Sequence, residues 1–299
     1  MDQADNLRLL VKMKKMSAEY EKQSSRPLAK IIAFTSGKGG VGKTNLTLNL
    51  ALMLSKEQGK KVLVLDADLG TANIDIMMGV IPKFNISHVI LDNKSIEEII
   101  IDGPYQVKII PGVSGMANLT TLTEIQKLRF FEQLEIYQAK HKPDYIFIDT
   151  GAGLGNNVIN FLLAADEIIV ISTPEPTSMS DAYAIVKVVN QYNCNIKINV
   201  VINLAKSEQD AKRVFQILFN VSEKFLAKEL NYLGFIKYDR MMPIAVKQQK
   251  PLVLSYPGAD ASLEILKLSK CITNKTADTN KTFKNFFEIA GRYFGWNHD

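Results

Sequence analysis

Short, almost wholly apolar segments recur along the middle of the chain and alternate with longer segments of mixed polarity. The apolar segments cover residues 31–35, 62–66, 107–111, 145–149, 167–172, 198–203 and, more weakly, 233–238. Strands that are apolar at every position, rather than at alternate ones, are covered on both faces, which is typical of a parallel sheet. The pattern therefore predicts seven strands in a mostly parallel sheet.

The segments between these strands have the apolar spacing of helices. Helices are expected at residues 43–55, 123–139, 179–191, 209–226 and 261–272. Alternating strands and helices predict an α/β fold, with a doubly wound sheet covered by helices on both faces. We expect one domain at 31–272, preceded by an N-terminal arm at 1–30 and followed by a linker and an amphipathic helix at 273–299.

Composition agrees with a globular protein that has one large core. The chain has 299 residues, of which 46% are hydrophobic and 22% charged. No apolar run approaches the ~20 residues that span a bilayer, and the first residues lack the order of a secretory signal, so a cytoplasmic location is expected. The two cysteines, Cys194 and Cys271, lie far apart and predict neither a disulfide framework nor a metal or iron-sulfur site.

Charge is concentrated at the two ends of the chain. Residues 1–30 carry 7 basic and 4 acidic side chains, a net +3, and residues 265–299 carry 6 and 3, also +3. The body at 31–264 carries 23 and 24, a net −1. A nearly neutral body argues against a DNA-coating surface, so no nucleic-acid partner is expected. The basic ends predict contact with something anionic, unless they are merely solvated tails.

A glycine-rich segment follows the first predicted strand directly and leads into the first predicted helix. It matches the phosphate-loop pattern GxxxxGK[ST] in the required context. Glycines let successive backbone N–H groups turn toward phosphate oxygens, and the helix N-terminus adds its positive dipole end. Lys43 is expected to meet the phosphates of ATP or ADP, and the Thr44 hydroxyl to bind Mg²⁺. The expected nucleotide-binding residues here are Gly37, Lys38, Gly39, Gly40, Val41, Gly42, Lys43, Thr44 and Asn45.

Acidic residues follow two of the predicted strands. Asp66 and Asp68 stand at the end of the second strand, and Asp149 ends the strand at 145–149. Ligands of open α/β sheets bind at the carboxyl ends of the strands, so these carboxylates are expected beside the phosphates.

Lys38 is a second lysine in the loop, one that a single subunit does not need to hold its nucleotide. On this residue the segment KGGVGKT resembles the deviant phosphate loop of the MinD/ParA family of P-loop ATPases. The resemblance implies that two copies close face to face around two ATP molecules and that Lys38 reaches the nucleotide of the partner. It also implies slow ATP hydrolysis, with Lys38, Lys43 and Asp68 as catalytic residues.

The same resemblance gives roles to the acidic residues and to an adenine pocket. Asp149 would hold Mg²⁺ through water, and Asp66 would support the metal or Thr44 from behind. Asp68 would position the attacking water. Asn203 would contact the base, and Tyr238 and Asp239 lie in the segment that walls it, although Lys237 stands where family members often have Pro. A plain strand-end role for Asn203 is the alternative.

Aromatic residues recur at helical spacing near the C-terminus, opposite a polar face. Such a helix is suited to the headgroup plane of a bilayer, or it packs on its own domain. One tail would bind membrane weakly, whereas two tails on an ATP-held dimer reinforce each other. Peripheral association with the inner face of the cell membrane is therefore expected in the ATP state. The expected membrane-facing residues are Phe283, Phe286, Phe287, Tyr293, Phe294 and Trp296.

The first residues match the pattern DQAxxLR through Asp2, Gln3, Ala4, Leu7 and Arg8. This segment resembles the activation motif of the FlhG group of flagellar-number regulators within the MinD/ParA family. The resemblance implies a homodimer that regulates flagellar placement and number, stimulates the GTPase FlhF, and contacts the C-ring proteins FliM and FliN or FliY. The alternatives are a MinD-type positioner of the division site and a ParA-type DNA segregator. A nitrogenase-type reductase would need cysteines placed for a shared cluster.

Overall fold

The computed structural model describes residues 29–68, 72–91, 94–113 and 124–274. The seven expected strands are all present, with an additional two-residue strand that the apolar pattern did not predict. The strands are β1 (Lys30–Ser36), β2 (Val62–Ala67), β3 (Ile101–Asp102), β4 (Val107–Ile110), β5 (Tyr145–Ala152), β6 (Glu167–Ser172), β7 (Lys197–Ala205) and β8 (Asn231–Lys237).

These strands form one sheet in the order β3-β4-β2-β5-β1-β6-β7-β8. Every pair is parallel except β3 with β4. The central strands are buried along almost their whole length, as expected for strands covered on both faces. From β1 the chain winds first toward β4 and later toward β8, so the direction of winding reverses beside β1. This confirms the doubly wound α/β fold.

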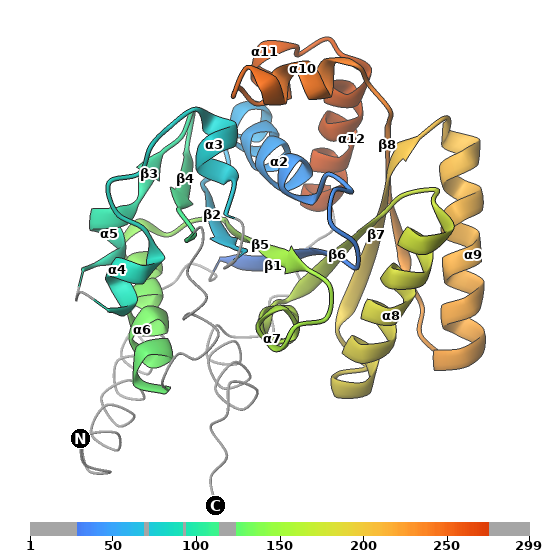
Figure 1. The fold of residues 1–299 in the computed structure, drawn as a ribbon, viewed down its shortest axis with the longest axis horizontal. Coiled ribbons are helices and arrows are strands. Elements are labelled where there is room, and N and C mark those ends of the chain that lie inside the picture. The colour runs from blue at the N-terminus through green and yellow to red at the C-terminus, as the bar shows by residue number, and fades with distance from the viewer. Residues whose placement is uncertain (1–28, 69–71, 92–93, 114–123, 275–299) are drawn as a thin grey trace, which may run out of the picture.

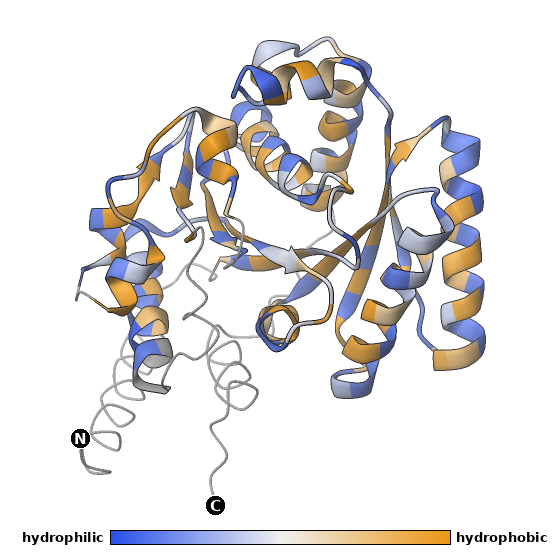
Figure 2. Ribbon diagram, viewed as in Figure 1, coloured by the Kyte–Doolittle hydropathy of each residue, from blue (hydrophilic) through white to orange (hydrophobic). Residues whose placement is uncertain are grey.

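Helices form a layer on each face of the sheet (Figure 1). On one face, the helices share a hydrophobic core with the sheet, and α2 lies at the centre of that core. This layer consists of α2 (Lys43–Gln58), α3 (Ile74–Met78), α10 (Met241–Lys247), α11 (Leu252–Ser255) and α12 (Asp260–Asn274). The other contains α4 (Ile86–Ile90), α5 (Ile96–Ile99), α6 (Glu124–His141), α7 (Asn156–Ala164), α8 (Pro176–Tyr192) and α9 (Glu208–Leu226). In Figure 2 apolar and polar residues alternate along α9, and its buried residues include Ala211, Val214 and Leu218. No helix within these described ranges is long and apolar enough to cross a bilayer.

The helix α2 is buried nearly all round, because the sheet lies on one side of it and α12 on the other. It begins immediately after Gly42 and ends at Gly59, whose left-handed backbone (φ 63°) lets its N–H cap the last turn. At that end, Gln58 Nε2 donates to Ser269 Oγ on α12 at 3.1 Å. The helix therefore runs from the carboxyl edge of the sheet to the amino edge, where both Ala29 and the end of α12 lie.

Candidate functional site

The phosphate loop connects β1 to α2 at the carboxyl edge of the sheet, where the sequence predicted it. Two glycines are required by its path. A Cβ on Gly37 would lie 2.3 Å from Asp181 Cβ on α8, so only glycine lets the loop pass this close. Gly42 has φ 85°, and a Cβ there would lie 2.4 Å from Asn203 Nδ2. Val41 between them is buried and anchors the loop to the core.

Asn203, at the carboxyl end of β7, braces this loop from below. Its Nδ2 donates to the Val41 carbonyl oxygen at 2.7 Å, and its Oδ1 accepts from the N–H of Leu204 at 2.9 Å. Asn203 is 7% exposed, so the bond to the loop is shielded from water. The side chain expected to contact the base thus has a contact with the loop as well.

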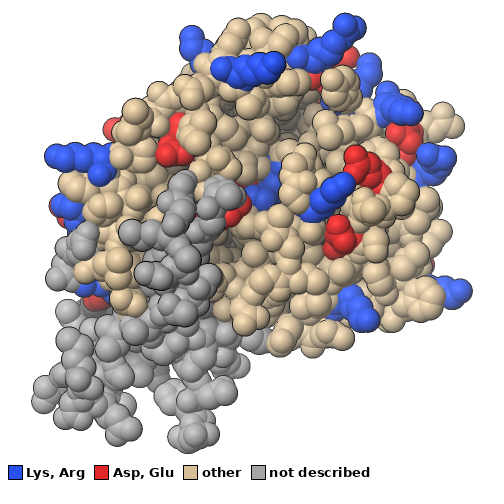
Figure 3. Space-filling view, in the orientation of Figure 1, with Lys and Arg blue, Asp and Glu red and all other residues tan. Residues whose placement is uncertain are grey.

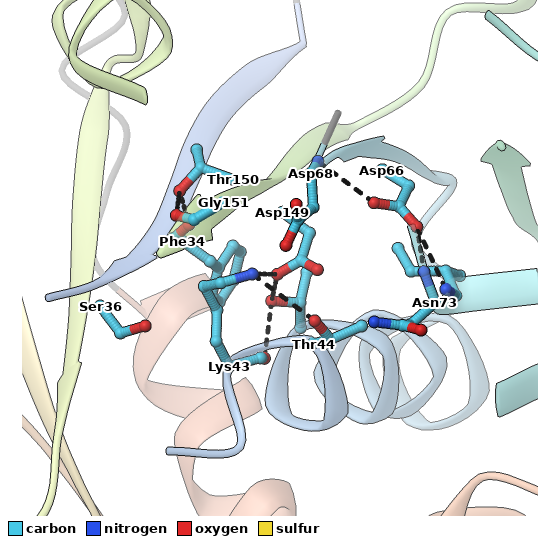
Figure 4. Close-up of polar contacts among 12 residues, drawn as sticks. Phe34, Ser36, Lys43, Thr44, Asp66, Asp68, Asn73, Asp149, Thr150 and Gly151 are labelled. Carbon is cyan, nitrogen blue, oxygen red and sulfur yellow. Dashed lines mark hydrogen bonds and ion pairs between the residues drawn. The ribbon is translucent and has the colours of Figure 1, made fainter. Parts of the chain in front are cut away.

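Lys43 is ion-paired with Asp149 in the interior of the site (Figure 4). Lys43 Nζ lies 3.0 Å from Asp149 Oδ1, and the two side chains are 7% and 0% exposed. Thr47 Oγ1 lies 3.1 Å from the same carboxylate oxygen. Burial raises the pKa of Asp149, while Lys43, Thr44 and Thr47 act in the opposite direction. Asp149 Oδ2 is buried and has no hydrogen-bond partner among the described residues.

Asp66 and Asp149 are paired positions on the neighbouring strands β2 and β5. The carboxylate of Asp66 accepts from the backbone N–H groups of Asn73 at 3.0 Å, Ile74 at 3.1 Å and Asp68 at 3.3 Å. Burial raises the pKa of Asp66 to about 7, and the nearby charge of Asp149 adds to the shift. In this structure Asp66 therefore holds the segment that leads into α3, a contact that the sequence did not predict.

Asp68 is half-buried and lies over the end of β5. A Cβ built on Gly151 would be 3.6 Å from Asp68 Oδ1, so the carboxyl group lies next to this glycine. The structure thus brings Asp68, Asp149 and Lys43 to the same edge of the sheet, as expected (Figure 4).

Lys38 lies at the rim of the site and is 45% exposed. Its Nζ is 2.8 Å from Glu175 Oε2 at the start of α8. The hydrogen bond to Glu175 raises the pKa of Lys38, and the charges of Glu175 and Asp181 act in the same direction. Glu175 was missed by the sequence analysis, although it lies three residues after the last residue of β6 and so at the same edge of the sheet.

The expected wall of the adenine pocket follows β8. Tyr238 is 58% exposed. The Asp239 carboxylate accepts from the N–H groups of Met241 at 2.8 Å and Ala261 at 3.1 Å, so it caps the start of two helices. Lys237, the residue that departs from the family pattern, is ion-paired with Asp260 at 3.2 Å. The expected partner-binding residues at 2–8 and membrane-facing residues at 283–296 lie outside the described residues.

Comparison with known proteins assigns the family. A family model described as an AAA domain matches residues 29–202. The antiactivator FleN of Pseudomonas aeruginosa is 37% identical over 233 residues, which cover 78% of this chain and 82% of FleN. The flagellum site-determining protein YlxH of Helicobacter pylori is 33% identical over 300 residues, covering 98% of this chain and 99% of YlxH. The chain belongs to the FleN/YlxH (FlhG) group of the MinD/ParA family.

As a member of this family the protein is a P-loop ATPase. Among solved structures, the MinD protein of Pyrococcus horikoshii in complex with Mg-ADP superposes with a TM-score of 0.67 at 25% identity, covering 85% of this chain and all of that one. Both predictions of family are therefore confirmed. The segment KGGVGKT indicated the MinD/ParA family, and the N-terminal pattern DQAxxLR indicated the FlhG group within it.

Proposed function

We propose that this protein is an ATP-dependent dimerising switch that regulates flagellar placement and number. The observation that carries the proposal is the placement of two loop lysines with different surroundings. Lys43 is buried and ion-paired with Asp149 of its own subunit, whereas Lys38 is exposed at the rim of the site. One lysine is available for its own nucleotide and the other for a neighbour. The relatives named FleN and YlxH supply the flagellar role.

Binding of ATP and Mg²⁺ would use residues of the loop and the strand ends. The loop from Gly37 to Asn45 would wrap the phosphates, with Lys43 leaving Asp149 to meet them. The Thr44 hydroxyl and, through water, Asp149 would hold Mg²⁺, with Asp66 behind them. The buried Asp149 Oδ2 fits this role, since it is an acceptor that no group of the described residues satisfies. When bound, the ion would offset charge on the phosphate oxygens.

Hydrolysis would be an in-line attack of water on the γ-phosphorus, with ADP leaving as phosphate forms. Asp68 would orient the water, and Lys43 together with Lys38 of the partner subunit would stabilise charge on the transferred group. Because the constellation is complete only in the dimer, turnover is expected to be slow and partner-dependent. Asn203, Tyr238 and Asp239 would surround the adenine.

Dimerisation would use the face that contains the nucleotide site. In Figure 3 many of the charged side chains in view lie around the edge of the molecule, and a few blue and red ones lie nearer the middle. Where such a face has few charges, two copies can approach closely because few charged groups must lose their water. Lys38 would leave Glu175 and reach the triphosphate of its twin.

The two terminal segments would contact other molecules. The arm at 1–30, through Asp2, Gln3, Ala4, Leu7 and Arg8, would dock on the GTPase FlhF and stimulate it. The amphipathic segment at 281–299 would bind membrane lipids when two tails act together, and the body would contact FliM and FliN or FliY. Sedimentation with liposomes in ATP, with and without residues 281–299, tests the membrane step, and equal pelleting of both forms would reject it.

The test of the switch is nucleotide-dependent sizing of the wild type beside Asp68→Ala and Lys38→Ala. With ATP, Asp68→Ala is expected to stay dimeric, whereas the wild type returns to monomer as ATP is consumed. Lys38→Ala is expected to bind ATP and stay monomeric. A wild type that remains single with a saturating nonhydrolysable analogue would reject the proposal.

A further inference from the structure

Thr47 lies one helical turn after Lys43 on α2, and its side chain is wholly buried. Its Oγ1 lies 3.0 Å from the Lys43 carbonyl oxygen and 3.1 Å from Asp149 Oδ1. A hydroxyl has one proton to donate, and the proton rotates to suit its surroundings. Thr47 can therefore bond to either acceptor, but to only one at a time.

The first of these contacts is ordinary. A threonine within a helix often donates to the carbonyl four residues earlier, with no role beyond the helix itself. The second contact is not explained in that way, because Asp149 belongs to β5 and is the buried carboxylate of the site. In this structure Asp149 Oδ1 also accepts from Lys43 Nζ at 3.0 Å, so this oxygen keeps a donor even when the Thr47 proton serves the carbonyl.

When Lys43 moves to the nucleotide, the Asp149 carboxylate loses a hydrogen-bond donor. Of the two side chains that lie within 3.1 Å of its Oδ1, one is a lysine at the very start of α2 and the other a threonine a turn further into the helix. A buried carboxylate that loses a donor carries a free-energy cost, and Oδ2 already has none. Rotation of the Thr47 hydroxyl from the Lys43 carbonyl to Oδ1 replaces the lost bond without any backbone movement.

We infer that Thr47 is a positioning residue that holds the Asp149 carboxylate when Lys43 moves to the nucleotide, and so keeps that carboxylate oriented toward Mg²⁺. The inference rests on the proposed function, since that function is what draws Lys43 away. Thr47 acts through Asp149 and contacts neither nucleotide nor metal itself.

The test compares Thr47→Val, which keeps the shape and removes the hydroxyl, with Thr47→Ser, which keeps the hydroxyl. The full-length protein is titrated with a fluorescent ADP derivative, once with Mg²⁺ and once with a chelator. For Thr47→Val the gain in affinity due to Mg²⁺ is expected to fall about tenfold, the effect of one hydrogen bond to a charged group. Thr47→Ser is expected to retain it. Without nucleotide, both are expected to unfold close to the wild type, since Lys43 still serves Asp149.

The outcomes separate the inference from the function on which it rests. A wild type without Mg²⁺-dependent binding of the ADP derivative would reject the proposed function itself. A normal wild type with an unchanged Thr47→Val, or with Thr47→Ser as defective as Thr47→Val, would reject the inference alone. If Thr47→Val folds poorly, Thr47→Ser and Thr47→Val are compared again in an Asp149→Ala background, which removes the acceptor of the hydroxyl. There the two must bind alike, and a difference would overturn the inference.

Discussion

Lys38 Nζ lies 2.8 Å from Glu175 Oε2, so the lysine proposed to serve the partner subunit is ion-paired within its own. Glu175→Gln is expected to release it. The comparison is made in an Asp68→Ala background, in which ATP is expected to remain intact. There the Glu175→Gln variant should dimerise at a protein concentration equal to that of the Asp68→Ala protein or a few-fold lower, a small change because exposed ion pairs are weak. Sedimentation velocity across a protein titration measures this.

The matched control is Glu208→Gln, which removes an exposed ion pair to Lys212 on the distant helix α9. It should leave dimerisation unchanged. Loss of the dimer in Glu175→Gln would contradict the prediction, because it would mean that Glu175 is needed in the dimer and does not merely hold Lys38 in the monomer.

Gly42→Ala should damage the phosphate loop even without nucleotide. The backbone at Gly42 has φ 85°, and the added Cβ would lie 2.4 Å from Asn203 Nδ2. Strain of this kind costs ~1–3 kcal/mol of unfolding free energy. Gly39→Ala is the control, because its Cβ would meet nothing within 4 Å. Urea unfolding of both nucleotide-free variants should therefore show a loss for Gly42→Ala alone, and equal losses would contradict the geometry.

Asn203→Ala should lower the affinity for ATP and GTP together. The side chain braces the loop through its 2.7 Å bond to the Val41 carbonyl, and the loop would hold the phosphates of either nucleotide. Losing one buried hydrogen bond is expected to cost about tenfold in affinity. Asn199→Ala removes a buried asparagine at the other end of β7 and should lower stability without this effect. A larger loss for ATP than for GTP would indicate a base contact in addition to the loop bond, and a loss confined to ATP would contradict the bracing role.

Glu135 on α6 should make stability depend on pH. The side chain is half-buried, and burial raises its pKa to about 7, with the charge of Glu132 adding to the shift. Between its ordinary pKa and about 7 the folded chain binds more protons than the unfolded chain, so the unfolding free energy falls as pH rises. Glu135→Gln should remove this loss and be more stable than the wild type by about 1–2 kcal/mol near pH 8, less than the full shift implies because the group is partly exposed.

Urea unfolding at about pH 4.5, 6 and 8 measures this difference, which should vanish at the lowest pH. Glu132→Gln removes only the neighbouring charge and should give a smaller gain. A difference between Glu135→Gln and the wild type that stays constant over the range would contradict a titrating Glu135.

The sheet could be predicted from the sequence because its strands are apolar at every position, a pattern that few other elements share. Segments such as 31–35 and 167–172 differ from the observed strands β1 and β6 by at most one residue at an end. β3 escaped prediction because its two residues pair only with β4 and have no pattern of their own. The helix α7 escaped because it is only nine residues long and mostly buried, and the other short helices because seven residues or fewer are too short to show a clear helical period.

The site was predictable where a motif fixes the backbone, as from Gly37 to Thr44, and at strand ends, where Asp66 and Asp149 lie side by side as register partners. Contacts between distant elements were not predictable. The bond from Asn203 to the loop and the ion pair of Lys38 with Glu175 depend on how strands β1, β6 and β7 are ordered, and that order is a tertiary property.

The span of α2 has a mechanical consequence. A helix of 16 residues is ~24 Å long and stiff along its axis. Its first residue is Lys43 in the phosphate loop. Its last residue, Gln58, donates a hydrogen bond to Ser269 on α12, five residues before that helix ends at Asn274. A displacement of the loop along the axis of α2 would therefore reach the last turns of α12 at the opposite edge of the sheet, close to the residue at which the described C-terminal region ends.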